Sequence, residues 1–265
     1  MTGGGRQRAT RTTAVTDRPG APSSWRPAAV FFDFAGTLFS DRALRDAHLD
    51  QLRFVAATIG VDATAQRLRA AYRRGMAESY GDMGSTPAYR HRSLFAEAFK
   101  AMARDLGGDI DESTAQEAVD RQYRATVEHA TLRPDARDTL GALRQASVHV
   151  QIVSNIDDDQ VHPLIDRLGL NHVVDAVTSS DEALSCKPDP GIYQVALDKA
   201  DCCPTDVLFV GDSLRHDVEG PAAMGMRTAW MVEDRGHSDP GNIRPDFVVR
   251  RLAEVTYLVG LEVGR

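Results

Sequence analysis

Short, nearly continuous apolar runs recur along the chain, and longer stretches separate them. Such runs are typical of strands in a parallel sheet, because both faces of each strand are buried. In the separating stretches the apolar residues return at helical spacing. This alternation predicts an α/β fold with a doubly wound parallel sheet. The predicted strands are 28–34, 148–154, 173–179, 206–212, 227–232 and 246–249.

The interval between the first two predicted strands breaks this alternation. Residues 41–131 contain several amphipathic helical patterns and no convincing strand. We therefore predict a helical domain at 41–131, inserted into a Rossmann-like core domain made of residues 27–40 and 132–265. The apolar positions with helical spacing include Leu49, Leu52, Ala56 and Ile59 before Gly60, and Leu94, Phe95, Ala98 and Met102.

Capping side chains mark the start of two predicted helices. Ser113 and Gln116 have the spacing of a capping box, which predicts a helix that begins near residue 114. Asp189, followed by Pro190, predicts an N-cap and a first-turn proline for a helix over 190–200.

Residues 1–26 differ in composition from the rest of the chain. They are rich in Gly, Thr, Arg, Ser and Pro and lack apolar periodicity, which predicts a disordered tail. A signal peptide would need an apolar central region, and this segment has none. The Arg and Thr content would also suit a transit peptide, but a solvated extension and a cytoplasmic location are the favoured interpretation.

Overall composition narrows the class of partner. The chain has 265 residues and a formal net charge of −7, which argues against nucleic acid or an anionic membrane as its partner. No apolar run reaches the length of about 18 residues that a membrane-spanning helix needs. Cys186, Cys202 and Cys203 are an odd number of cysteines and fit a reducing compartment. We expect a monomer or a homodimer.

Polar side chains stand where several predicted strands end. In an open parallel sheet, ligands bind beyond the carboxyl ends of the strands, so these residues are expected to share one cleft. Carboxylates suit Mg²⁺, and a lysine and a hydroxyl can hold phosphate oxygens. The combination indicates a hard cation next to a phosphoryl group. The residues are Asp33, Ser154, Asn155, Asp212 and Asp217, with Lys187 in the loop CKPDP before a helix.

Four sequence motifs carry a family resemblance. They are FFDFAGTL, IVSN, the Lys187 of CKPDPGIY, and FVGDSLRHDVEGPAAMGM. In order and spacing they resemble the motifs of the haloacid dehalogenase-like (HAD) hydrolase superfamily, and the match spans roughly 28–250. The four motifs together are specific, although any one alone would not be. The helical insertion resembles the C1 cap domain of that superfamily.

The resemblance implies how a phosphoryl group would be handled. Asp33 would be the nucleophile that attacks phosphorus and becomes an aspartyl phosphate. Ser154, Asn155 and Lys187 would bind the phosphoryl group, and Lys187 would also offset negative charge near Asp33. A small phosphorylated metabolite is the implied substrate. The physical logic is general, since a carboxylate can attack an anionic group only where cations and donors screen the repulsion.

The resemblance also implies a magnesium site. Asp33, the backbone carbonyl of Ala35 and Asp212 would ligate Mg²⁺, while Asp217 would support the water shell of the metal or Lys187. Thr37 would hold the turn after the first strand.

Ala35 departs from the pattern of the phosphatases in this superfamily. They usually carry a second Asp two residues after the nucleophile, which protonates the leaving oxygen and then activates water. An alanine can do neither. General acid–base catalysis is typically worth about 10²–10⁴-fold, so hydrolysis of ordinary phosphate esters should be slow unless another group supplies it. In a phosphatase, His48 or the cluster 89–92 could do so, although a solvated helix face is the favoured interpretation of that cluster.

A carbon–phosphorus hydrolase is a second interpretation. Phosphonoacetaldehyde hydrolases of the superfamily also have Ala at this position, and they act on a phosphonate through a cap lysine that forms a Schiff base. The early part of the insertion offers only Arg69, Arg73 and Arg74 for that role, and Lys100 is expected to face solvent.

Two further interpretations stay open. A dehalogenase would attack carbon without a metal, but dehalogenases of the superfamily commonly carry an aromatic residue at this position, and the acidic GDSLRHD motif favours a metal. A non-catalytic fold that binds a phosphorylated ligand or a partner would not need the intact acids and lysine.

The remaining polar residues have structural interpretations. Cys186 is expected to be a small packing residue, and His216 a surface helix residue, although it could face the cleft. Residues 157–159 are three aspartates expected at a helix N-terminus, where the helix dipole favours negative charge.

Overall fold

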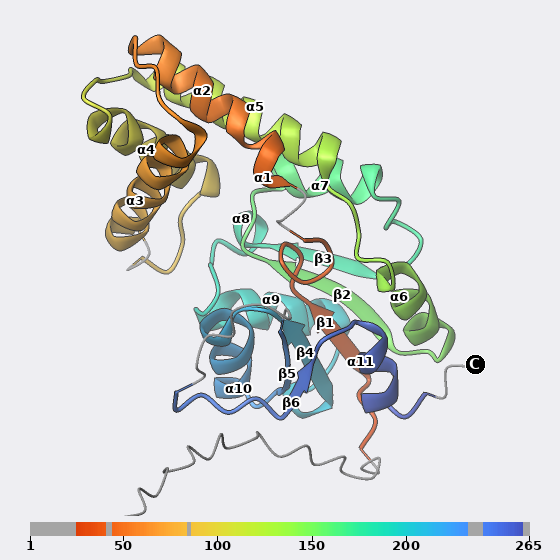
Figure 1. Cartoon of the computed structure of the whole chain (residues 1–265). Coiled ribbons are helices and arrows are strands. Elements are labelled where there is room, and N and C mark those ends of the chain that lie inside the picture. Colours follow the sequence, from red (N-terminus) through yellow and green to blue (C-terminus); the bar gives the residue numbers. More distant parts are fainter. Residues whose placement is uncertain (1–24, 41–43, 84–85, 233–240, 262–265) are drawn as a thin grey trace, which may run out of the picture.

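The computed structural model of the chain describes residues 25–40, 44–83, 86–232 and 241–261. Its centre is a parallel six-stranded sheet with the strand order β3-β2-β1-β4-β5-β6, shown in Figure 1. All predicted strands are present, and the doubly wound α/β fold is confirmed. The strands are β1 (Ala29–Phe32), β2 (His149–Ser154), β3 (Ala176–Ser179), β4 (Val207–Gly211), β5 (Arg227–Met231) and β6 (Phe247–Val249).

Helices cover both faces of the sheet, so successive side chains of one strand enter two different cores. Val30 and Phe32 of β1 pack in the larger core, whereas Ala29 and Phe31 pack in the smaller one. All of them are fully buried, which explains why β1 reads as an uninterrupted apolar run. The larger core is closed by α6 (Ala136–Gln145), α7 (Asp158–Arg167) and α11 (Ala253–Leu258), and the smaller one by α9 (Pro190–Ala200).

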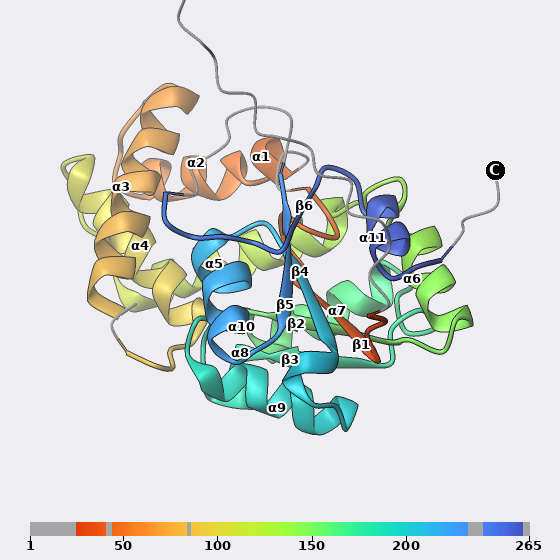
Figure 2. The same cartoon turned by 90° about the horizontal axis from the view of Figure 1, so that it is seen from below.

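The described part of 41–131 contains helices and no strand, and it has a core of its own. This group of helices, called the helical module below, lies beyond the carboxyl ends of the strands, to one side of the sheet (Figures 1 and 2). Its apolar residues form a cluster separate from those of the sheet. The module consists of α1 (Leu44–Ala47), α2 (Leu49–Thr58), α3 (Ala65–Met83), α4 (His91–Asp105) and α5 (Glu112–His129).

Shorter helices complete the described chain. They are α8 (Ser180–Ala183), the 3-10 helix η2 (Pro204–Asp206), the π-helix η3 (Leu214–Glu219) and α10 (Gly220–Ala223). None of the helices in the described ranges is long and apolar enough to cross a membrane.

One of the two predicted helix caps is wrong and the other is confirmed. Helix α5 starts two residues earlier than predicted, and the carboxylate of Asp111 accepts a hydrogen bond from the backbone N–H of Thr114 at 2.8 Å. Ser113 therefore lies inside the first turn and cannot be the N-cap. For α9, Asp189 accepts from the N–H of Gly191 at 3.0 Å, as the Asp-Pro sequence predicts.

Trp25 belongs to the predicted tail but contacts the sheet domain. The indole N–H of Trp25 donates to the carbonyl oxygen of Thr205 at 3.0 Å, and the guanidinium of Arg227 lies 4.3 Å from the ring centroid. Trp25 also packs against the larger core, because its ring offers apolar surface as well as a donor. Residues 1–24 of the predicted tail lie outside the described residues.

Two glycines of α3 test how closely the helices of the module pack. A Cβ atom at Gly75 would lie 2.4 Å from the carbonyl oxygen of Ala98 in α4, whereas one at Gly81 would have no neighbour within 4 Å. Gly75→Ala should lower the free energy of unfolding by about 1–3 kcal/mol, because the two backbones must separate. Gly81→Ala gains the same helix propensity without the clash and should raise it by about 0.5–1 kcal/mol. Urea unfolding measures both, and equal stabilisation by the two substitutions would contradict the close packing.

Candidate active site

The pairing of the strands brings the predicted polar residues to one edge of the sheet. Asp33 directly follows β1, Asp212 directly follows β4, and Ser154 is the last residue of β2. The register aligns these ends, because Phe32 lies beside Ile152 on one neighbour and Val210 on the other. The N–H of Asp33 still donates to the carbonyl of Val210, at 2.9 Å, so the backbone holds the acid at the strand end.

Lys187 is the centre of this group. Its ammonium donates to Oδ1 of Asp33 at 2.8 Å and to Oδ1 of Asp217 at 2.7 Å, and the residue is only 3% exposed. Ser154 Oγ donates to the same Asp33 oxygen at 3.3 Å. Burial alone would lower the pKa of Lys187, but Asp217 and Asp33 outweigh it, and the pKa lies above its ordinary value. The lysine is therefore a permanent buried cation.

Asn155 fixes the backbone from which Lys187 projects. Its side-chain oxygen accepts from the N–H of Lys187 at 2.6 Å, and its side-chain nitrogen donates to the carbonyl of Lys187 at 3.0 Å. These two bonds use both ends of the amide. In this arrangement Asn155 positions the lysine, and its predicted role in holding the phosphoryl group stays a prediction.

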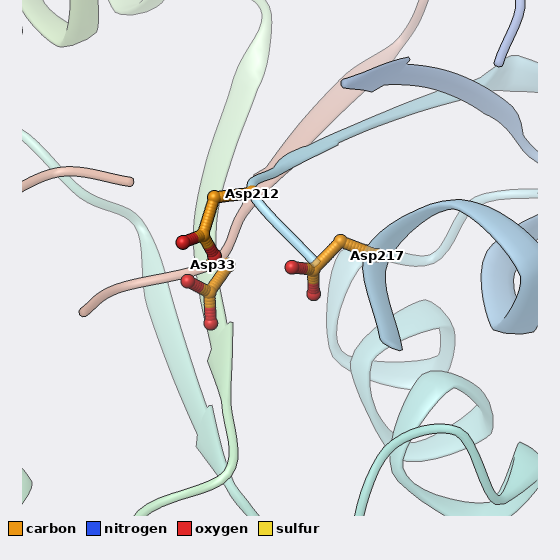
Figure 3. A group of neighbouring side chains, drawn as sticks. All are labelled: Asp33, Asp212 and Asp217. Atoms are coloured by element: carbon orange, nitrogen blue, oxygen red, sulfur yellow. The ribbon is translucent and has the colours of Figure 1, made fainter. Parts of the chain in front are cut away.

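Three carboxylates gather around one point at this edge (Figure 3). Asp33, Asp212 and Asp217 each offer an oxygen, and these oxygens lie within 4.8 Å of one another. Two glycines make the approach possible. A Cβ atom at Gly36 would lie 2.4 Å from Oδ2 of Asp212, and one at Gly211 would lie 2.3 Å from Cβ of Asp217.

The charge of this group fits a divalent cation. The group contains three carboxylates and a single lysine, so acids outnumber the base within it. Burial raises the pKa of Asp217, and Lys187 partly offsets that increase. An all-oxygen donor set with excess negative charge is the kind that binds Mg²⁺.

The turn after β1 is held from two sides. Thr37 donates its hydroxyl proton to Oδ2 of Asp33 at 3.1 Å, in agreement with its predicted place in the turn. Arg133, which returns from the module to the sheet, donates to the carbonyl oxygens of Thr37 at 2.8 Å and Gly36 at 2.6 Å. The sequence contains no signal for Arg133, because its partners lie about a hundred residues away and are backbone atoms.

A cavity of about 570 Å³ lies between the sheet and the helical module. Ala35, Ser154 and Asn155 line it on the side of the sheet. Ala35 is an exposed residue of this lining. His48 and His91 line the same cavity from the module.

His48 presents a neutral imidazole of defined tautomer. Its Nε2 lies 2.9 Å from Oγ1 of Thr126, whose own proton goes to the carbonyl of Gln122 at 2.8 Å. Thr126 must therefore accept, and the proton of His48 is on Nε2. Burial lowers the pKa of His48 to about 4, with His129 adding to the effect.

The cluster 89–92 is not the solvated helix face that we predicted. His91 is only 9% exposed, and burial lowers its pKa to about 4 despite the nearby Asp157. Arg90 and Arg92 do form ion pairs at the surface, with Asp181 at 3.1 Å and Asp159 at 2.9 Å respectively. The cluster is half-buried because α4 begins there and its first turn meets the sheet domain.

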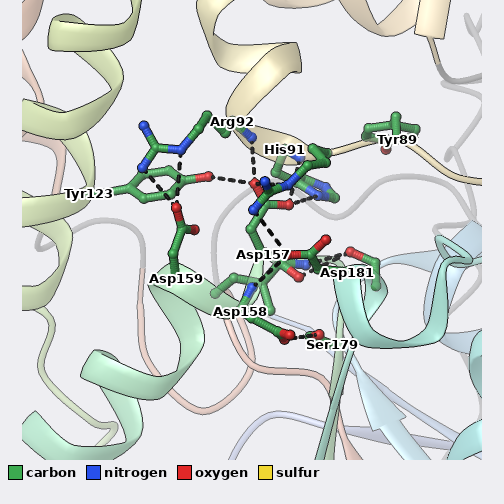
Figure 4. Close-up of polar contacts among 12 residues, drawn as sticks. Tyr89, His91, Arg92, Tyr123, Asp157, Asp158, Asp159, Ser179 and Asp181 are labelled. Atoms are coloured by element: carbon green, nitrogen blue, oxygen red, sulfur yellow. Dashed lines mark hydrogen bonds and ion pairs between the residues drawn. The ribbon is translucent and has the colours of Figure 1, made fainter.

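Asp157 makes that contact, as Figure 4 shows. It is fully buried, and its carboxylate accepts from the backbone N–H groups of His91 and Arg92, each at 2.8 Å, and from the hydroxyl of Tyr123 at 3.2 Å. Asp157 precedes α7, as predicted, but its side chain makes no cap bond to that helix. Instead it caps α4 of the module, which the sequence could not indicate because the partner lies 66 positions away.

His216 also contacts the module. It was predicted to be a surface helix residue, but its Nε2 lies 3.0 Å from the hydroxyl of Tyr80 in α3. Burial lowers the pKa of His216 to about 4, and Lys187 adds to this effect. The prediction for Cys186 holds, since it is buried. Lys100 pairs with Glu97 at 2.8 Å away from the cavity lining, with its side chain 20% exposed.

Comparisons with known proteins agree on the type of protein. The model of a family described as haloacid dehalogenase-like hydrolase matches residues 27–225. Ribulose-1,5-bisphosphate 5-phosphatase of Halopiger xanaduensis is 29% identical over 204 residues, which are 76% of this chain and 82% of that protein. Haloacetate dehalogenase H-2 of a Moraxella species is 25% identical over 88% of this chain and 98% of its own.

A solved structure shows the same fold. The crystal structure of YfnB from Bacillus subtilis, named as a HAD-hydrolase and bound to magnesium, superposes with a TM-score of 0.73. The superposition covers 90% of this chain and all of the other, at 20% identity. At that identity the similarity concerns the fold alone.

Asp157→Asn tests the contact between the sheet domain and α4. An amide has only one accepting oxygen, so a backbone N–H of His91 or Arg92 would lose its partner, and we expect the free energy of unfolding to fall by about 1–3 kcal/mol. Asp159→Asn on the same helix is the control, because Asp159 meets Arg92 at the surface and should contribute less than about 1 kcal/mol. Urea unfolding of both variants gives the comparison, and equal losses would show that Asp157 does not hold α4.

Proposed function

Since the chain belongs to the haloacid dehalogenase-like hydrolase family, we propose that it is a Mg²⁺-dependent phosphatase that acts on a small phosphorylated metabolite. The observation that carries the proposal is the cluster of Asp33, Asp212 and Asp217 around Lys187. Attack on a neutral carbon gains nothing from three gathered acids. Attack on a phosphoryl group requires cations, and these acids supply a place for one.

Asp33 is the proposed nucleophile. Both of its oxygens are held, Oδ1 by Lys187 and Ser154 and Oδ2 by Thr37, so the carboxylate has a fixed direction. One of its oxygens would form a bond to phosphorus while the bond from phosphorus to the leaving oxygen breaks. Water would then hydrolyse the aspartyl phosphate and restore the carboxylate. Lys187 and Ser154 would hold phosphoryl oxygens during both steps.

The metal-binding roles follow the family resemblance, in which Asp217 would support the site from behind. Its two oxygens are held by Lys187 at 2.7 Å and by the N–H of Ser213 at 2.9 Å, and the residue is only 1% exposed. Asp33, Asp212 and the carbonyl of Ala35 would be the direct ligands. A bound Mg²⁺ reduces the repulsion between the carboxylate and the phosphoryl oxygens.

Ala35 leaves the proton transfers to another group. The histidines that share its cavity are the candidates, and His48 is the better defined of them. Because Nε2 of His48 carries the proton that Thr126 accepts, its Nδ1 has a lone pair that can take a proton from water. We propose His48 as the base that assists hydrolysis of the aspartyl phosphate, in place of a carboxyl at position 35.

The dehalogenase is the second candidate function, because the Moraxella haloacetate dehalogenase aligns over nearly its whole length. Halide release from haloacetate without Mg²⁺ would favour it over the phosphatase.

The phosphonate hydrolase requires a lysine that forms a Schiff base. The described residues lining the cavity include arginines and no lysine, so trapping with borohydride should give no adduct. A purely binding role would be excluded by a burst of aspartyl phosphate.

Asp33→Asn should abolish turnover of phosphate esters. An amide is a poor nucleophile, and its nitrogen cannot ligate Mg²⁺, so no aspartyl phosphate should form. Hydrolysis of a panel of phosphorylated metabolites, with Mg²⁺ and after chelation of the metal, measures the effect. Retention of full activity by the variant, or activity of the native chain that chelation leaves untouched, would refute the proposed roles.

Ala35→Asp should increase the hydrolysis of simple phosphate esters. The new carboxyl would lie at an exposed position of the cavity lining and could protonate the leaving oxygen. Such general acid catalysis typically raises the rate by about 10²–10⁴-fold. p-Nitrophenyl phosphate serves as the control, because its leaving group hardly needs a proton. The leaving group of an alkyl phosphate does need one, so we expect a gain that is confined to the alkyl ester. A loss with both esters would contradict the proposed use of this position.

A further inference from the structure

The wall that the helical module contributes to the cavity is cationic. Arg45 of α1 and Arg69 and Arg73 of α3 line it, and the described lining contains no aspartate or glutamate. The histidines of the lining do not add to this charge at neutral pH, since burial lowers the pKa of His48 and of His91 to about 4. The cavity beside Ala35 therefore attracts anions.

Two of these guanidinium groups have no carboxylate partner among the described residues. Arg69 pairs with Asp46 at 2.8 Å, but neither Arg45 nor Arg73 forms an ion pair within the described chain. The next residue of α3 differs in this respect. Arg74 makes a two-pronged contact with Asp105, at 2.9 and 2.7 Å, on the outside of the module. Arg45 and Arg73 thus line the cavity without a carboxylate partner among the described residues.

Apolar side chains form much of the rest of the lining. They belong to Phe39, Leu44, Leu52, Phe95 and Leu164. A ligand that fills the cavity would meet phosphate-binding groups near Ser154, apolar side chains and guanidinium groups. The volume of about 570 Å³ is that of a site for a small metabolite.

We infer that the substrate carries a second anionic group, a carboxylate or a phosphate, on a short carbon chain, and that Arg73 and Arg45 bind this group. The inference rests on the proposed phosphatase function and names the class of its substrate. Guanidinium groups suit both anions because they donate two parallel hydrogen bonds to neighbouring oxygens. Ordinary monoesters would fill the strand-end site and leave both arginines unpaired.

Matched pairs of esters test this inference. 3-Phosphoglycerate and glycerol 3-phosphate differ by one carboxylate, and propane-1,3-diol bisphosphate and 3-hydroxypropyl phosphate differ by one phosphate. In each pair the native chain should prefer the ester with two anionic groups. The pair with the larger preference identifies which second anion the site takes. No preference in either pair would overturn the inference.

Arg73→Gln should reduce this preference, measured as the ratio of kcat/KM between the two esters of a pair, by about 10–100-fold, as expected for loss of a charge-assisted contact. Arg45→Gln should reduce it in the same direction. Arg74→Gln is the matched control, since this neighbour pairs with Asp105 outside the cavity, and it should leave the ratio unchanged. An equal reduction by Arg74→Gln, or no reduction by Arg73→Gln and Arg45→Gln, would contradict the assignment.

A binding measurement separates this inference from the proposed function. 3-Phosphonopropionate should bind the native chain in the presence of Mg²⁺ more tightly than propylphosphonate, and Arg73→Gln should remove the difference in a calorimetric titration. If that difference is found but no ester is hydrolysed, the phosphatase proposal fails and the second anion site stands. If esters are hydrolysed and the two phosphonates bind equally, the phosphatase proposal stands and the second anion site fails.

Discussion

The buried ammonium of Lys187 is the interaction on which the site depends. An ammonium that is 3% exposed is tolerated only because two carboxylates lie within 2.8 Å of it. Those carboxylates come from the end of β1 and from η3, so a single side chain ties two distant segments to one point. Asn155, at the end of β2, holds the lysine backbone from the third direction. Removing the lysine would leave Asp33 and Asp217 buried with like charges, and the edge of the sheet could not keep its geometry.

A second constraint places the helical module against this edge. Asp157 accepts two backbone N–H groups at the start of α4, and His216 meets Tyr80 of α3. Both contacts come from residues that are close in sequence to the lysine-centred group. Asp157 lies just after Asn155, and His216 directly precedes Asp217. The cavity is therefore built by the same segments that build the strand ends. Its cationic wall and the wall formed by the strand ends are held in one fixed relation.

The sequence predicted the sheet and the strand-end residues because their signals are local. Each buried strand is one apolar run, and each strand-end residue directly follows such a run, so parallel pairing brings Asp33, Ser154 and Asp212 together. The contacts that the sequence did not predict have a different origin. Asp157 and His216 sit in polar segments whose local pattern suits a helix N-terminus or a surface turn, and their partners lie 66 and 136 positions away. The error at Ser113 is of another kind, since Asp111 competes for the same cap and offers a charged acceptor.

The alanine at position 35 is electrostatically compatible with the arginines of the module that line the same cavity. A carboxylate at position 35 would face Arg45, Arg69 and Arg73 across a space with no other acid in its described lining. It would attract those guanidinium groups and repel an anionic leaving group, so the acid that serves ordinary esters would oppose a substrate with two anionic groups. An alanine removes that conflict and leaves the full positive potential to the substrate. In the proposed phosphatase, proton transfer would then fall to a neutral group such as His48, which contributes no charge to compete with the ligand. The alanine next to the proposed nucleophile and the cationic wall would thus be two parts of one electrostatic arrangement.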